Sequence, residues 1–78
     1  MIGNQKFLKA LGENINKLRK EKGLSFLELA LESDIEKANL VKLTSKGTNI
    51  TVTTLHNISK GLGVTASELM DFPFEDLN

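Results

Sequence analysis

The sequence predicts an all-α fold, a compact bundle of five short helices. Apolar residues recur at steps of three and four along several stretches, which places them on one face of a helix. Ser or Thr residues stand directly before such stretches, where their side chains can cap a helix. Apart from the short NITVT at 49–53, no stretch alternates as a strand would. The length of 78 residues suits one domain only, so we expect a single domain over 1–78.

The first helix is expected over 4–22. Gly23 should end it, because glycine adopts the left-handed conformation after a helix at little cost. Gly12, in its middle, should weaken the helix by about 1 kcal/mol relative to alanine. The apolar positions of this helix share one face, and they are Leu8, Leu11, Ile15 and Leu18.

The second and third helices are expected close together, with an interruption at Ser33 and Asp34. Ser25 and Glu28 have the spacing of a capping box, in which each side chain accepts a hydrogen bond from an otherwise unpaired amide. This box should start a helix that ends near residue 32. The third helix should follow over about 36–44.

Two further helices are expected after a loop rich in turn formers at 46–50. Thr51 can cap a fourth helix over 52–62, which Gly63 ends. A second capping box, made by Thr65 and Glu68, opens a short fifth helix that reaches about residue 70. Pro73 prevents a continuation.

The composition excludes several classes of function. The chain has no cysteine and a single histidine, His56, so we expect no disulfide, no metal and no cofactor. No apolar run approaches the ~20 residues of a membrane span. The N-terminus lacks the apolar segment of a signal peptide, so we expect a cytoplasmic protein. No nucleophile and base pair or glycine-rich phosphate loop is visible, and we expect no enzyme.

The charges are balanced overall but unevenly distributed. Ten basic and ten acidic residues give a net charge of zero, which argues mildly against nucleic-acid binding. Four of the carboxylates lie in 67–78, where there is no Lys or Arg, so 1–66 holds ten basic and six acidic residues. A basic body with a short acidic tail at 71–78 is compatible with phosphate binding by the body.

Residues 25–45 have the pattern of a helix-turn-helix, in which two short helices cross at a sharp angle. The crossing needs a small residue, which is Ala30, and a turn residue that tolerates positive φ, which is Asp34. Apolar residues stand at the inner positions, and they are Leu29, Ile35, Leu40 and Leu43. The alternative is an unrelated helical core with the same periodicity.

From about residue 10 to residue 72 the chain resembles the lambda-repressor-like DNA-binding domains of the Cro/phage-repressor type. The motif, the LRKEKGLS at 18–25 and the NITVTTLHNISKGLGVTASEL at 49–69 carry this resemblance. The chain is also similar to small stand-alone transcriptional regulators such as restriction–modification controller proteins. The resemblance implies sequence-specific binding to double-stranded operator DNA by a homodimer, and no small-molecule ligand.

The resemblance places the third helix in the major groove, where Lys can donate to guanine, Asn can pair with adenine and apolar groups can meet the thymine methyl. The candidates for base contacts are Glu36, Lys37, Ala38, Asn39, Val41 and Lys42. The candidates for phosphate contacts are Arg19, Lys20, Ser25, Lys46, Thr48, Asn49 and Thr51. Two-fold pairing is expected because one such helix covers few base pairs. The candidates for the dimer interface are Ile50, Val52, Met70, Phe72 and Phe74, with Leu77 nearby. The alternative for Phe72 is that it folds back to cap the core.

The chain departs from the family pattern at several positions. Phe26 stands where the family usually has a Gln that contacts the DNA backbone. Thr44 stands where a Glu usually pairs with the residue at Arg19, so Arg19 should be free to reach a phosphate or simply exposed. The alternative function is therefore a helix-turn-helix fold kept as a protein-interaction module, with weak or no DNA binding. Its anchors would be the exposed aromatic side chains Phe26, Phe72 and Phe74.

Overall fold

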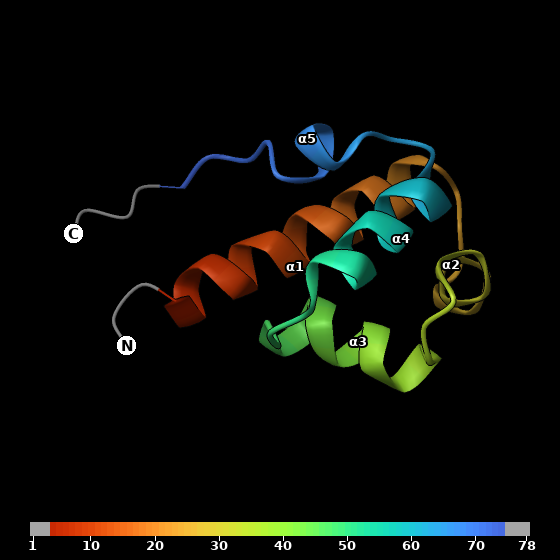
Figure 1. Cartoon of the computed structure of the whole chain (residues 1–78), viewed down its shortest axis with the longest axis horizontal. Coiled ribbons are helices and arrows are strands. Elements are labelled where there is room, and N and C mark those ends of the chain that lie inside the picture. The colour runs from red at the N-terminus through yellow and green to blue at the C-terminus, as the bar shows by residue number, and fades with distance from the viewer. Residues whose placement is uncertain (1–3, 75–78) are drawn as a thin grey trace.

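The computed structural model describes residues 4–74, and this range contains five helices and no strand. The helices are α1 (Asn4–Glu21), α2 (Phe26–Ser33), α3 (Lys37–Lys46), α4 (Val52–Leu62) and α5 (Ala66–Leu69). α1 runs along the molecule, with α3 on one side of it and α5 on the other (Figure 1). α2 packs against α3 and α4 at the end away from the start of α1. The predicted all-α fold is therefore confirmed. Among the described residues, no helix is long and apolar enough to cross a membrane.

The helix boundaries follow the predicted caps. Ser25 Oγ accepts from the Glu28 amide at 3.0 Å, and Glu28 Oε1 accepts from the Ser25 amide at 2.8 Å. Thr65 and Glu68 make the same reciprocal pair at the start of α5. α3 starts one residue later than predicted and ends two residues later, because Gly47 at φ 74° supplies its C-terminal cap.

Acid is expected to weaken the two capping boxes. The pKa values of Glu28 and Glu68 lie below the ordinary value because each carboxylate accepts from the backbone amide and hydroxyl of its capping residue. Their stabilisation is present above the unfolded-state pKa and is lost as pH falls through the lowered folded-state values. The Glu28→Gln/Glu68→Gln variant should therefore melt below the wild type at pH 7 and approach it near pH 2, as circular dichroism can measure. Glu13→Gln, on an exposed part of α1, is the control. A gap in melting temperature that does not change with pH would contradict this explanation.

The core takes at least one residue from every helix. Its fully buried apolar members are Leu11, Ile15, Leu29, Ala30, Leu40, Leu43, Ile58, Leu62 and Leu69. Ile35 is half-buried and packs against them. The inner positions predicted for the motif are therefore confirmed. Asp34 has φ 53° and ψ 48°, and the amide of Ile35 donates to the carbonyl of Ala30 at 3.1 Å, so aspartate takes the left-handed turn position where glycine is usual.

Gly12 is a contact point between α1 and α3. A Cβ atom at this position would overlap the backbone carbonyl oxygen of Leu43. The sequence predicted only a loss of helix stability at Gly12, and that interpretation was incomplete. The absent side chain lets α3 approach the backbone of α1, so Gly12 sets the position of α3.

The aromatic residues of the C-terminal segment fold back onto α1. The ring of Phe7 lies 5.6 Å from that of Phe72 and 5.3 Å from that of Phe74, between centroids. All three side chains are half-buried, and Phe72 packs against the core. Phe72 therefore folds back onto the core, as one of the two alternatives for it had predicted. The prediction that Phe74 is exposed was wrong, because Phe7 provides a partner for it. Leu77 and the remainder of the acidic tail at 75–78 lie outside the described residues.

Candidate nucleic-acid interface

α3 presents one polar face to solvent and one apolar face to the core. Leu40 and Leu43 are completely buried. The candidates for base contacts are all exposed, and they are Glu36, Lys37, Ala38, Asn39, Val41 and Lys42. The core therefore fixes α3 by its inner side and leaves cationic, amide and methyl groups on its outer side. These are the groups that distinguish base edges in the major groove.

Glu36 and Asn39 are neighbours on this outer face. Glu36 is the N-cap residue of α3, and its side chain makes no capping hydrogen bond. Its Oε1 instead accepts from Asn39 Nδ2 over 3.4 Å, which is a long and weak hydrogen bond. The Asn39 side chain is therefore turned toward the start of α3, with its Oδ1 left as an acceptor.

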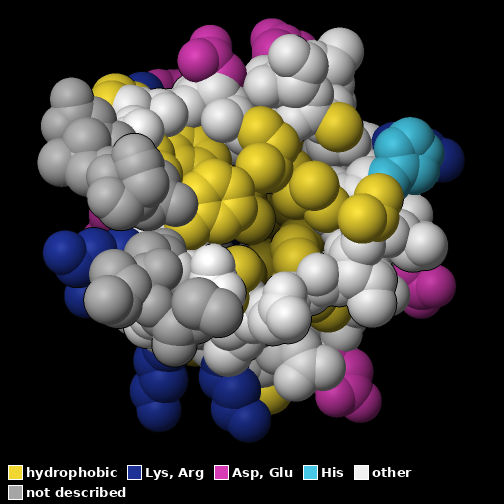
Figure 2. All heavy atoms as spheres, turned by 60° about the vertical axis from the view of Figure 1, so that its left-hand side comes forward, with side chains coloured by type: hydrophobic (Ala, Val, Ile, Leu, Met, Phe, Trp, Pro, Cys, Tyr) yellow, Lys and Arg dark blue, Asp and Glu magenta, His cyan; other side chains and the backbone are white. Residues whose placement is uncertain are grey.

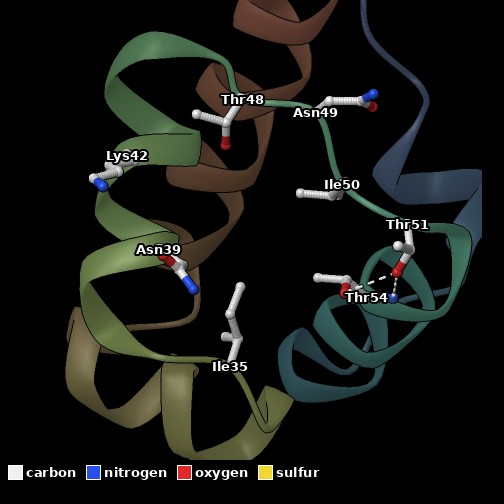
Figure 3. Close-up of a pocket in the computed structure, with 8 residues that line it drawn as sticks. All are labelled: Ile35, Asn39, Lys42, Thr48, Asn49, Ile50, Thr51 and Thr54. Atoms are coloured by element: carbon white, nitrogen blue, oxygen red, sulfur yellow. Dashed lines mark hydrogen bonds between the residues drawn. The ribbon is translucent and has the colours of Figure 1, made fainter.

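A hollow of about 390 Å³ lies between α3, the following loop and the start of α4. It is lined by Ile35, Asn39, Lys42, Thr48, Asn49, Ile50, Thr51 and Thr54. Figure 3 shows Asn39 and Ile50 pointing toward the space between α3 and the loop. The hollow thus brings two of the predicted base-contact residues together with three of the predicted phosphate-contact residues.

Thr54 belongs to this hollow and was missed by the sequence interpretation. Thr51 Oγ1 accepts from the Thr54 amide at 3.1 Å and donates to Thr54 Oγ1 at 3.0 Å (Figure 3). The prediction that Thr51 caps α4 could have identified Thr54, because the residue three positions after a capping residue lies beside it. Two hydroxyl groups therefore stand together at the start of α4.

Asn49 is directed differently from its neighbours. Its side chain points away from α3 (Figure 3). It also lines a second hollow, of about 300 Å³, with Asn4, Phe7 and Leu8. A role for Asn49 at the phosphates beside α3 would therefore require its side chain to turn.

The remaining phosphate candidates lie outside the hollow. Lys46 is exposed at the end of α3, where its carbonyl accepts from Gln5 Nε2 at 2.7 Å. Lys20 and Ser25 are exposed near the junction of α1 and α2. The Glu28 carboxylate accepts a hydrogen bond from the backbone amide of Ser25 at the start of α2. Its negative charge opposes the attraction of a phosphate to this helix end.

Arg19 is held within the protein. Its Nε and Nη2 donate to Asn16 Oδ1 at 3.1 and 2.9 Å, and its Nη1 donates to the carbonyl of Leu24 at 2.6 Å. The guanidinium carbon lies 4.1 Å from the centroid of the Phe26 ring, in a cation–π contact. The expectations of a free or simply exposed Arg19, and of an exposed Phe26 anchor, were both wrong. Arg19 therefore contacts Leu24 and Phe26 in place of the Glu carboxylate that the family usually has at the position of Thr44.

The chain is similar to known helix-turn-helix proteins in both sequence and structure. Residues 14–75 match the family model of the Cro/C1-type HTH DNA-binding domain. An uncharacterized HTH-type transcriptional regulator of Sinorhizobium fredii, y4dJ, is 37% identical over 62 residues, which are 80% of each chain.

Solved structures of two restriction–modification controller proteins are also similar. C.Esp1396I is 28% identical, with a TM-score of 0.77 over 83% of this chain and 84% of that one. C.AhdI from Aeromonas hydrophila has a TM-score of 0.76 over 80% of this chain and 94% of that one, and its 24% identity supports the fold alone.

Proposed function

The chain belongs to the Cro/C1-type helix-turn-helix family of DNA-binding transcriptional regulators, and we propose that it recognises specific sequences in double-stranded DNA with α3 in the major groove. Membership confirms the resemblance seen in the sequence, and it assigns the chain to a family of DNA-binding proteins rather than of enzymes. C.Esp1396I, at 28% identity, is a restriction–modification controller protein, so a role in controlling genes is part of the proposal.

The observation that carries the proposal is the exposed polar face of α3 beside the hollow at the start of α4. Lys37 and Lys42 can donate to guanine or to phosphates, and both are exposed on α3. The hydroxyls of Thr51 and Thr54 line the adjoining hollow, where a DNA backbone next to α3 would pass. The anchors predicted for the alternative module do not support it, since Phe26 and Phe72 pack within the protein.

The test is selection of binding sites from random duplexes, followed by titrations at several salt concentrations. A group of related sites should emerge, and the affinity for them should fall steeply with salt because lysines displace counterions from phosphates. If the protein binds no duplex even at low ionic strength, the proposal is wrong.

A homodimer is the second part of the proposal, since one α3 helix spans too few base pairs for useful specificity. Apolar side chains gather on the face seen in Figure 2. Val52 is 82% exposed and Met70 is 37% exposed, whereas Ile50, Phe72 and Phe74 are half-buried. The two exposed residues are therefore the best candidates to be covered by a second copy.

Val52→Glu is expected to raise the dimer dissociation constant by about tenfold or more, because pairing would bury an uncompensated charge. Analytical ultracentrifugation over a concentration series measures this change. Leu31→Glu is the matched control, since it charges another exposed apolar side chain, which lies on α2. If the wild-type protein is monomeric even at high concentration, the proposed homodimer is wrong.

A further inference from the structure

The last turn of α3 lies along one side of the first half of α1. Gln5, Lys9 and Gly12 are spaced by four and three positions, so they share a face of α1. A Cβ atom at Gly12 would overlap the carbonyl oxygen of Leu43. A Cβ atom at Gly47 would lie 2.5 Å from the backbone nitrogen of Lys9. Two points of close backbone contact therefore hold the end of α3 against α1.

Gln5 adds a third contact at the end of this row, where the start of α1 lies beside the end of α3 (Figure 1). Its Nε2 donates to the carbonyl of Lys46 at 2.7 Å and to the carbonyl of Gly47 at 3.2 Å. Both partners can only accept, so the amide nitrogen of Gln5 must face them rather than its amide oxygen. A helix leaves its last carbonyls without an intrahelical donor. Gln5 thus supplies a donor for the last residue of α3 and for its C-terminal cap.

The loop that follows α3 depends on this contact for its starting direction. Within residues 4–74, no hydrogen bond reaches residues 48–50, whereas Thr51 at the far end of the loop is fixed as the cap of α4. The carbonyl of Gly47 and the amide of Thr48 share one planar peptide group, so a donor on the carbonyl also orients Thr48. Thr48 lines the hollow between α3 and α4. Gln5 therefore controls how the loop enters the candidate interface.

We propose that Gln5 is a positioning residue for DNA binding, which acts through the loop at 46–50 rather than through its own contact with DNA. This role rests on the proposed DNA binding, in which Lys46 and Thr48 are candidates for phosphate contacts. A loop that is already held in place forms such contacts without an additional loss of backbone entropy on binding. Without the Gln5 donor, that loss would accompany each binding event and lower the affinity.

The test compares the wild type with Gln5→Met, which keeps the length of the side chain and removes its hydrogen-bond donor. The affinity should fall by about three- to tenfold, the range for one lost hydrogen bond, on the selected duplex and on a scrambled duplex alike. The ratio of the two affinities should stay within about twofold, because phosphate contacts carry no sequence information. In the free protein, changes in amide NMR shifts should cluster at 46–50.

Thermal unfolding separates this role from a contribution to stability alone. Gln5 is exposed, so its replacement by Met should lower the melting temperature by about 5 °C or less. Both proteins are then folded at room temperature, where a purely structural role would leave the DNA affinity unchanged. Gln5→Lys/Lys6→Gln is the matched control, because it keeps the net charge and restores a donor at position 5. Its affinity should stay within about twofold of the wild type.

Several results would overturn the proposal. If Gln5→Lys/Lys6→Gln binds as weakly as Gln5→Met, donation to the carbonyls is not the cause. A smaller ratio between the selected and the scrambled duplex in Gln5→Met would show that Gln5 acts on α3 itself rather than on the loop. If the wild type binds the selected duplex and Gln5→Met binds it equally well, only the role of Gln5 is wrong. If the wild type binds neither duplex, the DNA-binding proposal is wrong, and the role of Gln5 with it.

Discussion

Gly12→Ala is expected to lower the melting temperature by about 10 °C. The added methyl group would overlap the carbonyl oxygen of Leu43 and lie 3.1 Å from the Cα of Thr44, and these are backbone atoms that no side-chain rotation can move. α3 would have to shift away from α1. Overpacking of this kind costs about 3 kcal/mol, which outweighs the gain of about 1 kcal/mol in helix propensity. In a domain of this size, the net loss of about 2 kcal/mol corresponds to a shift of about 8–16 °C.

Gly63→Ala is the matched control, because it adds the same methyl group where there is space. Gly63 has φ 71° and nothing within 4 Å of the added atom, so only backbone strain of about 1 kcal/mol is expected. Thermal unfolding followed by circular dichroism compares the two variants. If Gly12→Ala is no less stable than Gly63→Ala, the contact between α1 and α3 is not the cause.

The helix boundaries were predictable because caps are local. Ser25 with Glu28, and Thr65 with Glu68, lie within four residues of each other, so their spacing alone predicts the hydrogen bonds that the structure contains. The inner positions of the motif were predictable for a similar reason, since helical periodicity decides which residues share a face. Asp34 was predictable from the φ angle that the turn requires.

The contacts that were not predicted join residues far apart in the sequence. The approach of Leu43 to Gly12 depends on how α3 crosses α1, and no local pattern contains that crossing. The packing of Phe74 depends on the position of Phe7 at the start of α1. Periodicity also left the outer side of α2 undetermined, because a helix of eight residues is too short to show which of its leucines have a partner.

The sequence could predict which residues of α3 face outward, but not how the candidate residues of other helices contact their neighbours. The six positions on the outer face of α3 followed from the inner positions of Leu40 and Leu43. Whether Arg19 reaches outward depended on Leu24 and Phe26, whose contacts with it form only when α2 packs beside the end of α1. The fold therefore holds one predicted cation in contacts within the protein and leaves the lysines of α3 as the main positive groups of the candidate interface.

Lys37→Ala/Lys42→Ala is expected to weaken binding to the selected DNA site by about a hundredfold or more. Each good contact to a base edge is worth about 1–3 kcal/mol, so the loss of two removes most of the discrimination between sites. Both side chains are exposed and alanine favours helix, so the fold should be retained. Fluorescence anisotropy on the selected duplex and on a scrambled duplex, at several salt concentrations, measures the effect.

The salt dependence separates the two ways in which these lysines can act. If they contact phosphates, affinity should fall on both duplexes and the salt slope should decrease by about two. If they contact bases, affinity should fall mainly on the selected duplex and the slope should change little. Lys17→Ala/Lys60→Ala removes the same charge from α1 and α4, and it should cost less than about threefold. An equal loss in this control would mean that α3 is not the DNA-contacting helix and that the lysines act only through total charge.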